Sequence, residues 1–221
     1  MSEMNKGVQL MQEGKLEEAA KVFMEEIEQN PNESLGYINF GNLLLHMNDF
    51  ERAEKFYQKG IELDPKAATA LYGLGNVYFE QALYKKAQKN YQQAIELGLQ
   101  ESDVYFMLGL SYQNEEHNIL ALPYLQRAVE LAPEDEIALF QYGLALAQTD
   151  QIDLAEKTFN KVIELNPNHS DAYYNLGITS MHKEDIEQAL EKLTKSLELD
   201  PEHALAANAK AAIEGMINPD S

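Results

Sequence analysis

Prolines recur in this sequence at a nearly constant interval of 34 residues. The successive gaps are 34, 68, 34 and 34 residues, so one expected proline is missing, at Leu99. The preceding residue, Gly98, can end a helix there by adopting a left-handed conformation. A fixed period of this length is typical of repeat proteins, in which each unit buries its apolar face against its neighbours. The five prolines of this series are Pro31, Pro65, Pro133, Pro167 and Pro201.

Three columns of residues share this period across six repeats. A glycine within a helix costs about 1 kcal/mol relative to alanine, so a glycine kept in every repeat indicates that another helix passes too close for a side chain. Each repeat is therefore predicted to contain a helix A, a short turn and a helix B that ends at the proline. The columns are Gly7, Gly41, Gly75, Gly109, Gly143 and Gly177; Ala19, Ala53, Ala87, Ala121, Ala155 and Ala189; and Phe23, Tyr57, Tyr91, Leu125, Phe159 and Leu193.

This pattern resembles the tetratricopeptide repeat (TPR), which combines Leu-Gly, an aromatic residue, alanine, a large residue and proline. Leu74-Gly75 with Tyr78 matches it, and so does the ending Ile61-Glu62-Leu63-Asp64-Pro65. The resemblance implies an all-α fold, a right-handed superhelical TPR solenoid of six helix-turn-helix repeats plus a C-terminal capping helix. We expect residues 1–221 to form a single TPR domain with repeats at 1–33, 34–67, 68–101, 102–135, 136–169 and 170–203, and the capping helix at about 204–217.

Two local features carry predictions of their own. The helix at 204–217 has Lys210 and Glu214 on the face that earlier A helices pack against their own B helix, which predicts a polar-faced cap. Pro123 lies inside the B helix of the fourth repeat, where it should shift the start of that helix or bend it.

Composition narrows the functional classes. With 37 acidic and 17 basic residues the net charge is −20, which argues against direct nucleic-acid binding, because phosphates are bound by clustered Lys and Arg. The acidic excess fits either simple solubility or attraction of a basic partner. No apolar run approaches the roughly 18 residues of a membrane span, and no signal-peptide pattern is present. The absence of cysteine fits a reducing compartment, and we expect a cytoplasmic, monomeric protein without membrane contact.

The sequence contains no recognisable catalytic or metal-binding constellation. The histidines are spread over distant repeats or lie at repeat junctions, as His169 and His203 do, and are interpreted as solvated polar residues. A glutamate column three residues before each proline position is interpreted as a solvated edge rather than a cation site. Phosphate-binding glycine loops and nucleophile elbows are absent. We therefore predict a protein that is not an enzyme and needs no cofactor and no metal.

The resemblance also implies where a ligand would bind. In TPR folds the A helices line a concave groove, and ligand contacts come mostly from their second, fifth, sixth, ninth, twelfth and thirteenth positions. Aromatic and aliphatic side chains there could anchor a partner, and amides could bond its backbone. An alternative is that these side chains only pack on neighbouring A helices. The predicted peptide-binding groove comprises Ile38, Asn39, Asn42, Tyr72, Asn76, Phe79, Phe106, Leu110, Phe140, Gln141, Leu144, Tyr174, Asn175 and Ile178.

One specificity of the family is not expected. The family's carboxylate clamp, which binds chaperone tails, needs basic residues at set positions of the A helices. This sequence lacks them there, since the fifth positions hold Ile38 and Tyr72. We expect a non-enzymatic scaffold or adaptor that binds a peptide segment or helix of a protein partner, which is basic or carries apolar anchors. Two alternatives remain open: a regulatory receptor for a small signalling peptide, and a self-associating structural protein.

Overall fold

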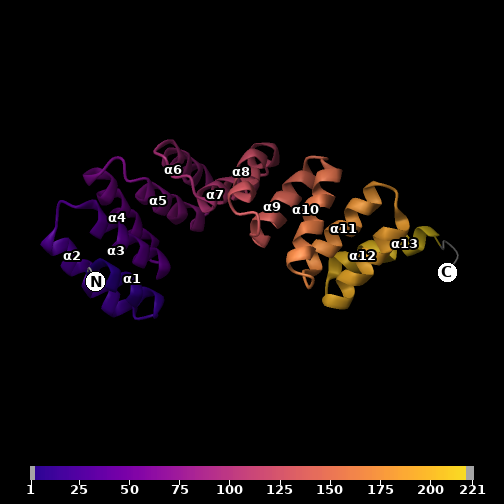
Figure 1. The fold of residues 1–221 in the computed structure, drawn as a ribbon, viewed down its shortest axis with the longest axis horizontal. Helices are drawn as coiled ribbons and strands as arrows, with labels where there is room; N and C mark the ends of the chain where they lie inside the picture. Colours follow the sequence, from indigo (N-terminus) through magenta and orange to yellow (C-terminus); the bar gives the residue numbers. More distant parts are fainter. Residues whose placement is uncertain (1–2, 218–221) are drawn as a thin grey trace. The chain divides into compact units, whose positions relative to one another are not determined.

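A computed structural model describes residues 3–217, with side chains from Lys6 onward. Within those residues there are thirteen α-helices and no strand (Figure 1). The chain divides into two compact units, residues 1–115 and residues 116–221, which are called unit 1 and unit 2 below. The predicted all-α class is therefore confirmed, whereas a single domain over 1–221 stays a prediction.

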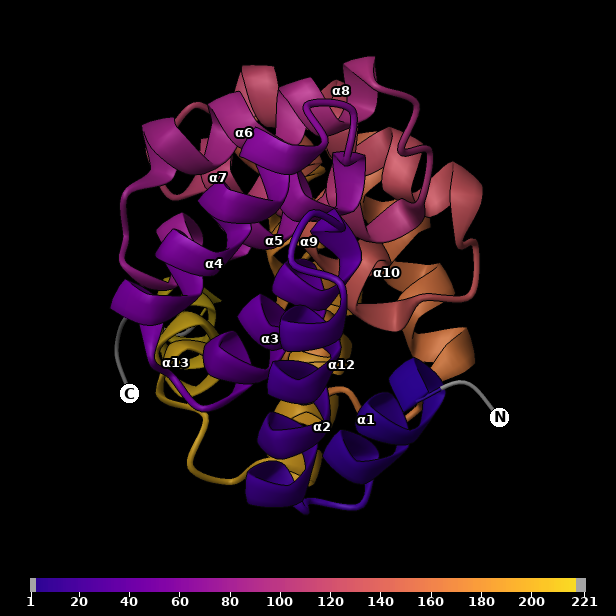
Figure 2. The ribbon, with the colours of Figure 1, turned by 90° about the vertical axis from the view of Figure 1, so that its left-hand side faces the viewer.

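Unit 1 contains three complete helix pairs and the A helix of a fourth. Each helix contacts the next one along the chain, and α1, α3, α5 and α7 also contact one another in succession, so the A helices form a row. Figures 1 and 2 both show α1 and α2 of the first pair side by side. The helices are α1 (Glu3–Gln12), α2 (Leu16–Gln29), α3 (Ser34–His46), α4 (Phe50–Leu63), α5 (Ala68–Glu80), α6 (Tyr84–Glu96) and α7 (Ser102–Gln113).

Unit 2 begins with a B helix and ends with the predicted cap. Its successive helices contact one another, and α11 also contacts α13. The cap buries Ala206 and Ile213 and leaves Lys210 and Glu214 paired at 3.9 Å, so the prediction of a polar-faced cap is confirmed. The helices are α8 (Asn118–Leu131), α9 (Glu136–Gln148), α10 (Ile152–Leu165), α11 (Ser170–His182), α12 (Ile186–Leu199) and α13 (Ala204–Ile217).

The three sequence columns form the core. All six alanines and all six large residues of the B helices have no exposed surface. A Cβ atom added to Gly75 would lie 2.5 Å from Cε1 of Tyr91, and one added to Gly143 would lie 2.7 Å from Cε1 of Phe159. Because real Cβ contacts essentially never fall below 3.0 Å, the aromatic ring of helix B occupies the space that glycine leaves on helix A. The predicted role of the glycine column is confirmed.

The turns follow the same period. Gly98 has a φ of 99°, and the N–H of Leu99 donates to the carbonyl oxygen of Ala94 at 3.0 Å, as predicted for the repeat without a proline. The turn between helices A and B also places one residue per repeat at positive φ. The sequence did not reveal this column because its residue types differ. Its members are Gly14, Asn48, Ala82, Glu116, Asp150 and Glu184.

Of the two effects predicted for Pro123, a shifted start of its helix is wrong, and a bend of the helix stays a prediction. Helix α8 begins at Asn118, 34 residues after the start of α6 at Tyr84, and runs to Leu131 without interruption. Pro123 is the sixth residue of α8, so the helix lacks one backbone hydrogen bond, the one to the carbonyl oxygen of Ile119. The neighbours Ala121 and Leu125 stay fully buried and keep the helix in register.

None of the helices within residues 3–217 combines the length and the apolar character that crossing a bilayer requires.

Candidate functional site

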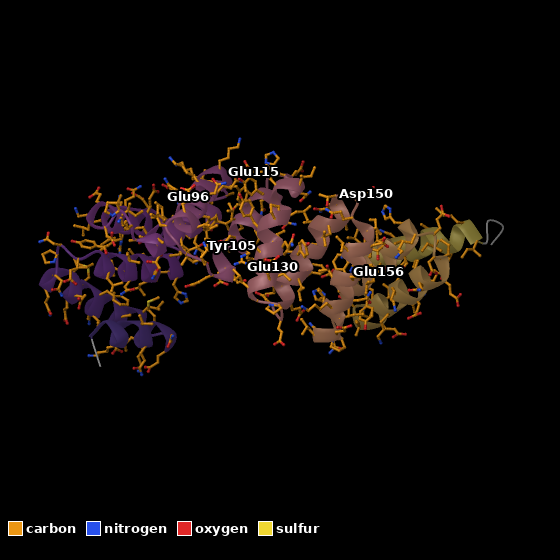
Figure 3. All side chains as sticks on the ribbon, turned by 45° about the horizontal axis from the view of Figure 1, so that its top comes forward. Glu96, Tyr105, Glu115, Glu130, Asp150 and Glu156 are labelled. Atoms are coloured by element: carbon orange, nitrogen blue, oxygen red, sulfur yellow. The ribbon has the colours of Figure 1, made fainter. Side chains whose placement is uncertain are left out.

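The A helices carry almost none of the charge of this acidic protein. Helices α3, α5, α7, α9 and α11 contain no lysine or arginine, and their carboxylates are Glu80, Asp103, Glu136 and Asp171. The acidic side chains labelled in Figure 3 belong instead to B helices, as Glu96, Glu130 and Glu156 do, or to turns, as Glu115 and Asp150 do. The surface that these five helices form within each unit, called its A face below, is therefore nearly uncharged.

The A face of unit 1 contains a cavity of about 350 Å³, the unit 1 pocket. It brings two predicted groove residues together, Tyr72 and Asn76 of α5. Helices α3 and α7 supply most of the remaining walls, so three A helices contribute to one site. The lining residues are Leu45, His46, Asn48, Tyr72, Asn76, Glu80 and Met107.

Two predicted asparagines of unit 1 are held by buried tyrosines of the B helices. The hydroxyl of Tyr57 donates to Oδ1 of Asn42 at 2.6 Å, and the hydroxyl of Tyr91 donates to Oδ1 of Asn76 at 2.7 Å. Neither tyrosine has exposed surface, whereas Asn42 is exposed and Asn76 is half-buried. Both asparagine amides therefore have a fixed orientation at the A face.

Tyr72 adds an aromatic ring and a hydroxyl to the unit 1 pocket. Its ring centroid lies 5.8 Å from that of Tyr91. Burial raises the pKa of Tyr72; the amide of Asn76 opposes this shift, and the carboxylates of Asp103 and Glu101 add to it. The phenol therefore stays protonated near neutral pH and can donate a hydrogen bond into the pocket.

Ile38 is not a groove residue, so that prediction is wrong. Its side chain is 4% exposed, and its Cγ1 lies 3.0 Å from the position of a Cβ added to Gly60 of α4. The equivalent position in the next B helix is Ala94, so Gly60 leaves space that Ile38 fills. Ile38 therefore belongs to the core of its helix pair.

The other predicted residues of unit 1 keep part of their surface. Phe79 is half-buried and packs edge-on against Tyr84 of α6 with 5.5 Å between ring centroids, so much of its ring serves the helix pair. Asn39, Phe106 and Leu110 are half-buried on α3 and α7.

The A face of unit 2 contains a cavity of about 220 Å³, the unit 2 pocket. It brings together three predicted residues, Leu144, Asn175 and Ile178. The Nδ2 group of Asn175 already donates to the carbonyl oxygen of Asp171 at 2.8 Å, so aliphatic carbon dominates what the pocket offers a ligand. The lining residues are Leu144, Ala147, Gln148, Ile152, Asn175, Ile178, Thr179 and His182.

The predicted rings of unit 2 are partly covered by histidines. The ring centroid of Phe140 lies 4.6 Å from that of His169, and that of Tyr174 lies 5.0 Å from that of His203. This supports the alternative that Phe140 and Tyr174 serve packing. Gln141, beside Phe140, is half-buried.

Both histidines cap helices, so interpreting them as solvated was wrong. Nδ1 of His169 accepts from the N–H of Ala172 at 3.3 Å, and Nδ1 of His203 accepts from the N–H of Ala206 at 3.2 Å. His203 is 8% exposed, and its Nε2 lies 3.1 Å from Oδ1 of Asp171 without the alignment of a hydrogen bond. Nδ1 accepts only in the neutral imidazole, so these contacts fix the tautomer.

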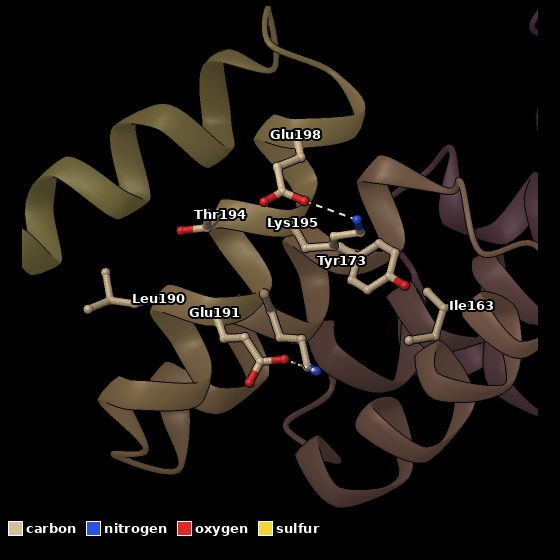
Figure 4. A pocket seen from close by; sticks show the side chains of 8 residues that line it. Ile163, Tyr173, Leu190, Glu191, Thr194, Lys195 and Glu198 are labelled. Atoms are coloured by element: carbon tan, nitrogen blue, oxygen red, sulfur yellow. Dashed lines mark hydrogen bonds and ion pairs between the residues drawn. The ribbon is translucent and has the colours of Figure 1, made fainter.

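A larger cavity of unit 2, of about 530 Å³, lies between α10, α11 and α12 (Figure 4). The sequence did not predict it. Its charged side chains pair with one another: Lys192 lies 3.0 Å from Glu191, and Lys195 lies 3.0 Å from Glu198. With its charges paired internally, it is a weaker candidate than the A-face pockets. It is lined by Ile163, Tyr173, Leu190, Glu191, Lys192, Thr194, Lys195 and Glu198.

No group of three side chains suited to hold a metal ion occurs in the part of the chain that the structure describes.

The tyrosine partners of the asparagines were missed as site residues, although the sequence contains a signal. Tyr57 follows Asn42 by fifteen residues, and Tyr91 follows Asn76 by the same interval. At the same spacing, Phe159 follows Leu144 and Leu193 follows Ile178. Among these four pairs, tyrosine therefore occurs on helix B only where helix A has asparagine.

Comparison with known proteins decides the family. Profiles described as TPR or tetratricopeptide repeats match residues 41–81, 68–97, 106–170 and 158–191. The crystal structure of YrrB, described as a TPR protein with an unusual peptide-binding site, is 46% identical and covers 87% of this chain and 99% of its own, with a TM-score of 0.83. The chain belongs to the tetratricopeptide-repeat family.

More distant structures share the TPR fold alone. PilF of Pseudomonas aeruginosa is 17% identical and covers 96% of each chain with a TM-score of 0.81. MamA is 24% identical and covers 77% of this TPR chain and 93% of its own with a TM-score of 0.71. No curated protein matches the sequence significantly.

Proposed function

We propose that this protein is a non-enzymatic scaffold or adaptor whose A faces bind a peptide segment or helix of a partner protein. The observation that carries the proposal is the pair of A-face pockets, one per unit, whose A helices have no lysine or arginine. TPR proteins in general act as interaction scaffolds, and the similar protein YrrB is described as having a peptide-binding site.

The unit 1 pocket fits a polar part of the ligand. Tyr72 and Asn76 offer hydrogen-bond donors, and Glu80 adds a carboxylate for which no ion pair is found among the described residues. This combination suits a backbone carbonyl oxygen together with a basic side chain.

The unit 2 pocket fits an apolar anchor. Burial of one aliphatic side chain against Leu144 and Ile178 contributes about 1.5–3 kcal/mol before the costs of association. A few such contacts are enough for micromolar affinity, which corresponds to about −8 kcal/mol.

Selection from a random peptide library displayed on phage, followed by calorimetry on the recovered peptides, tests the proposal. Tyr72→Ala and Ile178→Asp each alter one A-face pocket at a half-buried position. Thr194→Asp is the matched control, because it changes the cavity between α10, α11 and α12 instead. We expect each peptide to lose at least about tenfold in affinity, roughly 1.4 kcal/mol, with one of the two pocket variants.

The control separates the alternatives. Peptides that bind both pocket variants as tightly as the wild type but lose affinity for Thr194→Asp would place the binding surface outside the A faces. Circular dichroism of all three variants checks that helicity is unchanged.

The remaining predictions about the molecule belong to the same proposal. We propose a monomeric, cytoplasmic protein without catalytic activity. Light scattering on the purified chain would test the monomer, fractionation of cells the location, and activity screening the absence of catalysis. A concentration-dependent dimer would favour the alternative of a self-associating structural protein.

A further inference from the structure

The two asparagines of the unit 1 A face are held by an unusually complete arrangement. Tyr57 and Tyr91 are fully buried, and their hydroxyls bond Asn42 and Asn76 at 2.6 and 2.7 Å. Burial raises the pKa of both phenols, and a neighbouring Tyr72 raises them further. Each hydroxyl therefore stays protonated at neutral pH and can donate.

A donor beneath the asparagine dictates which end of the amide faces outward. A phenol oxygen can also accept from an N–H group, but contacts of 2.6 and 2.7 Å have the length of O–H···O bonds, which are shorter than N–H···O bonds, so the carbonyl oxygen of each amide faces the tyrosine. With Oδ1 used in this way, the Nδ2 group of Asn42 and of Asn76 is the part left for contacts at the A face; one N–H of Asn76 bonds the hydroxyl of Tyr72, which leaves the other for a ligand. Nδ2 can only donate, so these positions recognise acceptors.

The equivalent residue pairs of unit 2 indicate that the tyrosine and the asparagine act together. In unit 2 two of the large B-helix residues are Phe159 and Leu193, which carry no hydroxyl, and the A-helix positions fifteen residues before them hold Leu144 and Ile178. All four large residues are fully buried, so the phenol is not needed to fill the core. What Tyr57 and Tyr91 add is the hydrogen bond to the amide.

We propose that Tyr57 and Tyr91 are positioning residues that fix Asn42 and Asn76 as donors for the backbone carbonyl oxygens of a proline-rich peptide segment in polyproline II conformation. This inference rests on the proposed function and names the chemistry of the partner for unit 1.

Two arguments favour polyproline II over a helix or a strand. A helical ligand uses most of its carbonyl oxygens internally, whereas polyproline II leaves all of them free. It also repeats every three residues with a rise of about 3.1 Å, so carbonyl oxygens on one side recur about every 9 Å. Helices α3 and α5 pack against each other, and packed helices lie about 8–10 Å apart, so their equivalent residues have a matching spacing. The ring of Tyr72 in the same pocket provides an aromatic surface for proline.

The test uses the full chain and two readouts. Tyr57→Phe and Tyr91→Phe keep the buried ring, as Phe23 and Phe159 do in this column, and remove the hydroxyl. Tyr105→Phe is the matched control, because its hydroxyl donates to another side-chain amide of unit 1, Gln100, at 2.6 Å.

The first readout is nuclear magnetic resonance relaxation of the side-chain amides of Asn42 and Asn76 without ligand. We expect rigid amides in the wild type and in Tyr105→Phe, and mobile amides in the two Asn-linked variants. Equal mobility in all of them would overturn the positioning role. This readout does not depend on any peptide binding.

The second readout is titration with acetyl-hexaproline-amide, which has carbonyl acceptors and no backbone N–H between its caps. We expect shifts of the Asn42 and Asn76 amide signals in the wild type and at least fivefold weaker binding to the Tyr57→Phe, Tyr91→Phe double variant. Absence of binding to the wild type would overturn the proline-rich ligand, and the library peptides would show independently whether the A face binds any peptide at all. Undiminished binding to the double variant would overturn the role of the tyrosines.

Discussion

Unit 1 and unit 2 build the same helix pair but present different chemistry on their A faces. In α3 and α5 of unit 1 the ninth position of the A helix is asparagine, bonded to a buried tyrosine, as in the pair of Asn76 and Tyr91, whereas α7 has Leu110 there. In unit 2 it is aliphatic, as in the pair of Leu144 and Phe159. The unit 1 pocket has the larger share of polar surface, and the unit 2 pocket is mainly apolar.

The two units also differ in how the first turns of their A helices are capped. Asp135, His169 and His203 of unit 2 each accept a backbone N–H at the start of an A helix, whereas Glu33 and Ala67 of unit 1 make no side-chain cap. Two of these caps also cover the fifth-position rings of unit 2. We infer that the residues beneath the A face, such as the buried tyrosines and the capping histidines, decide which A-face side chains are free to bind.

The largest expected difference between the units appears at alkaline pH. Burial raises the pKa of Tyr57 and Tyr91, and burial together with the hydrogen bond to Glu54 raises the pKa of Tyr78 to about 12. Phenols in the unfolded chain ionise at about pH 10. Their contribution to stability is complete below that pH and is lost as the pH rises through the folded values. We therefore expect helix loss to begin above about pH 10 and to start in unit 1.

Tyrosinate absorbance and circular dichroism, recorded together against pH, check this expectation. The triple variant with phenylalanine at Tyr57, Tyr78 and Tyr91 should keep its helices to higher pH than the wild type. Tyr142→Phe is the unit 2 control, since burial raises the pKa of that tyrosine as well. The same alkaline midpoint for the triple variant and the control would show that the units do not differ.

A smaller effect tests what the units share. Gly75→Ala and Gly143→Ala each force a Cβ against the ring of Tyr91 or Phe159. Overpacking of this kind costs typically 1–3 kcal/mol, and we expect about this loss in the free energy of unfolding in both units, measured by urea denaturation. Gly215→Ala is the control: nothing lies within 4 Å of its added Cβ, and it should gain up to about 1 kcal/mol from helix propensity. A loss confined to one of the two sites would mean that the helix pairs are not equivalent.

The sequence predicted what depends on the period and missed what depends on a particular neighbour. The glycine, alanine and large-residue columns predicted the helix pairs, because their spacing alone puts Gly75 under Tyr91. Ile38 was assigned to the ligand surface because its position matched the family rule, but Gly60 across the helix pair draws it into the core. The caps of His169 and His203 were missed because each depends on a backbone N–H that only the turn geometry brings close.

The pair of Tyr91 and Asn76 allows unit 1 to be converted to the pattern of unit 2. Tyr91→Phe should cost about 0.5–1.5 kcal/mol for the lost hydrogen bond, and Asn76→Leu about 1–3 kcal/mol because the buried hydroxyl loses its acceptor. The double variant should be more stable than the sum of the two changes predicts, since neither polar group is then left unpaired. Denaturation of all four chains measures this coupling. Strict additivity would show that the hydrogen bond does not link the two side chains.

The smallest effect concerns the turn column, where the units use different residues. Ala82 in unit 1 has a φ of 57° and Asp150 in unit 2 a φ of 62°. Alanine has no side-chain group to bond the local backbone in this left-handed region, which costs it roughly 1 kcal/mol, whereas aspartate tolerates the conformation better. Ala82→Gly removes that strain at some cost in chain entropy. We therefore expect the free energy of unfolding, measured by thermal denaturation, to rise by about 0.5 kcal/mol. Asp150→Gly should change stability by less. A larger gain at Asp150 than at Ala82 would indicate that contacts of the turn residue, and not its backbone conformation, set the stability of these turns.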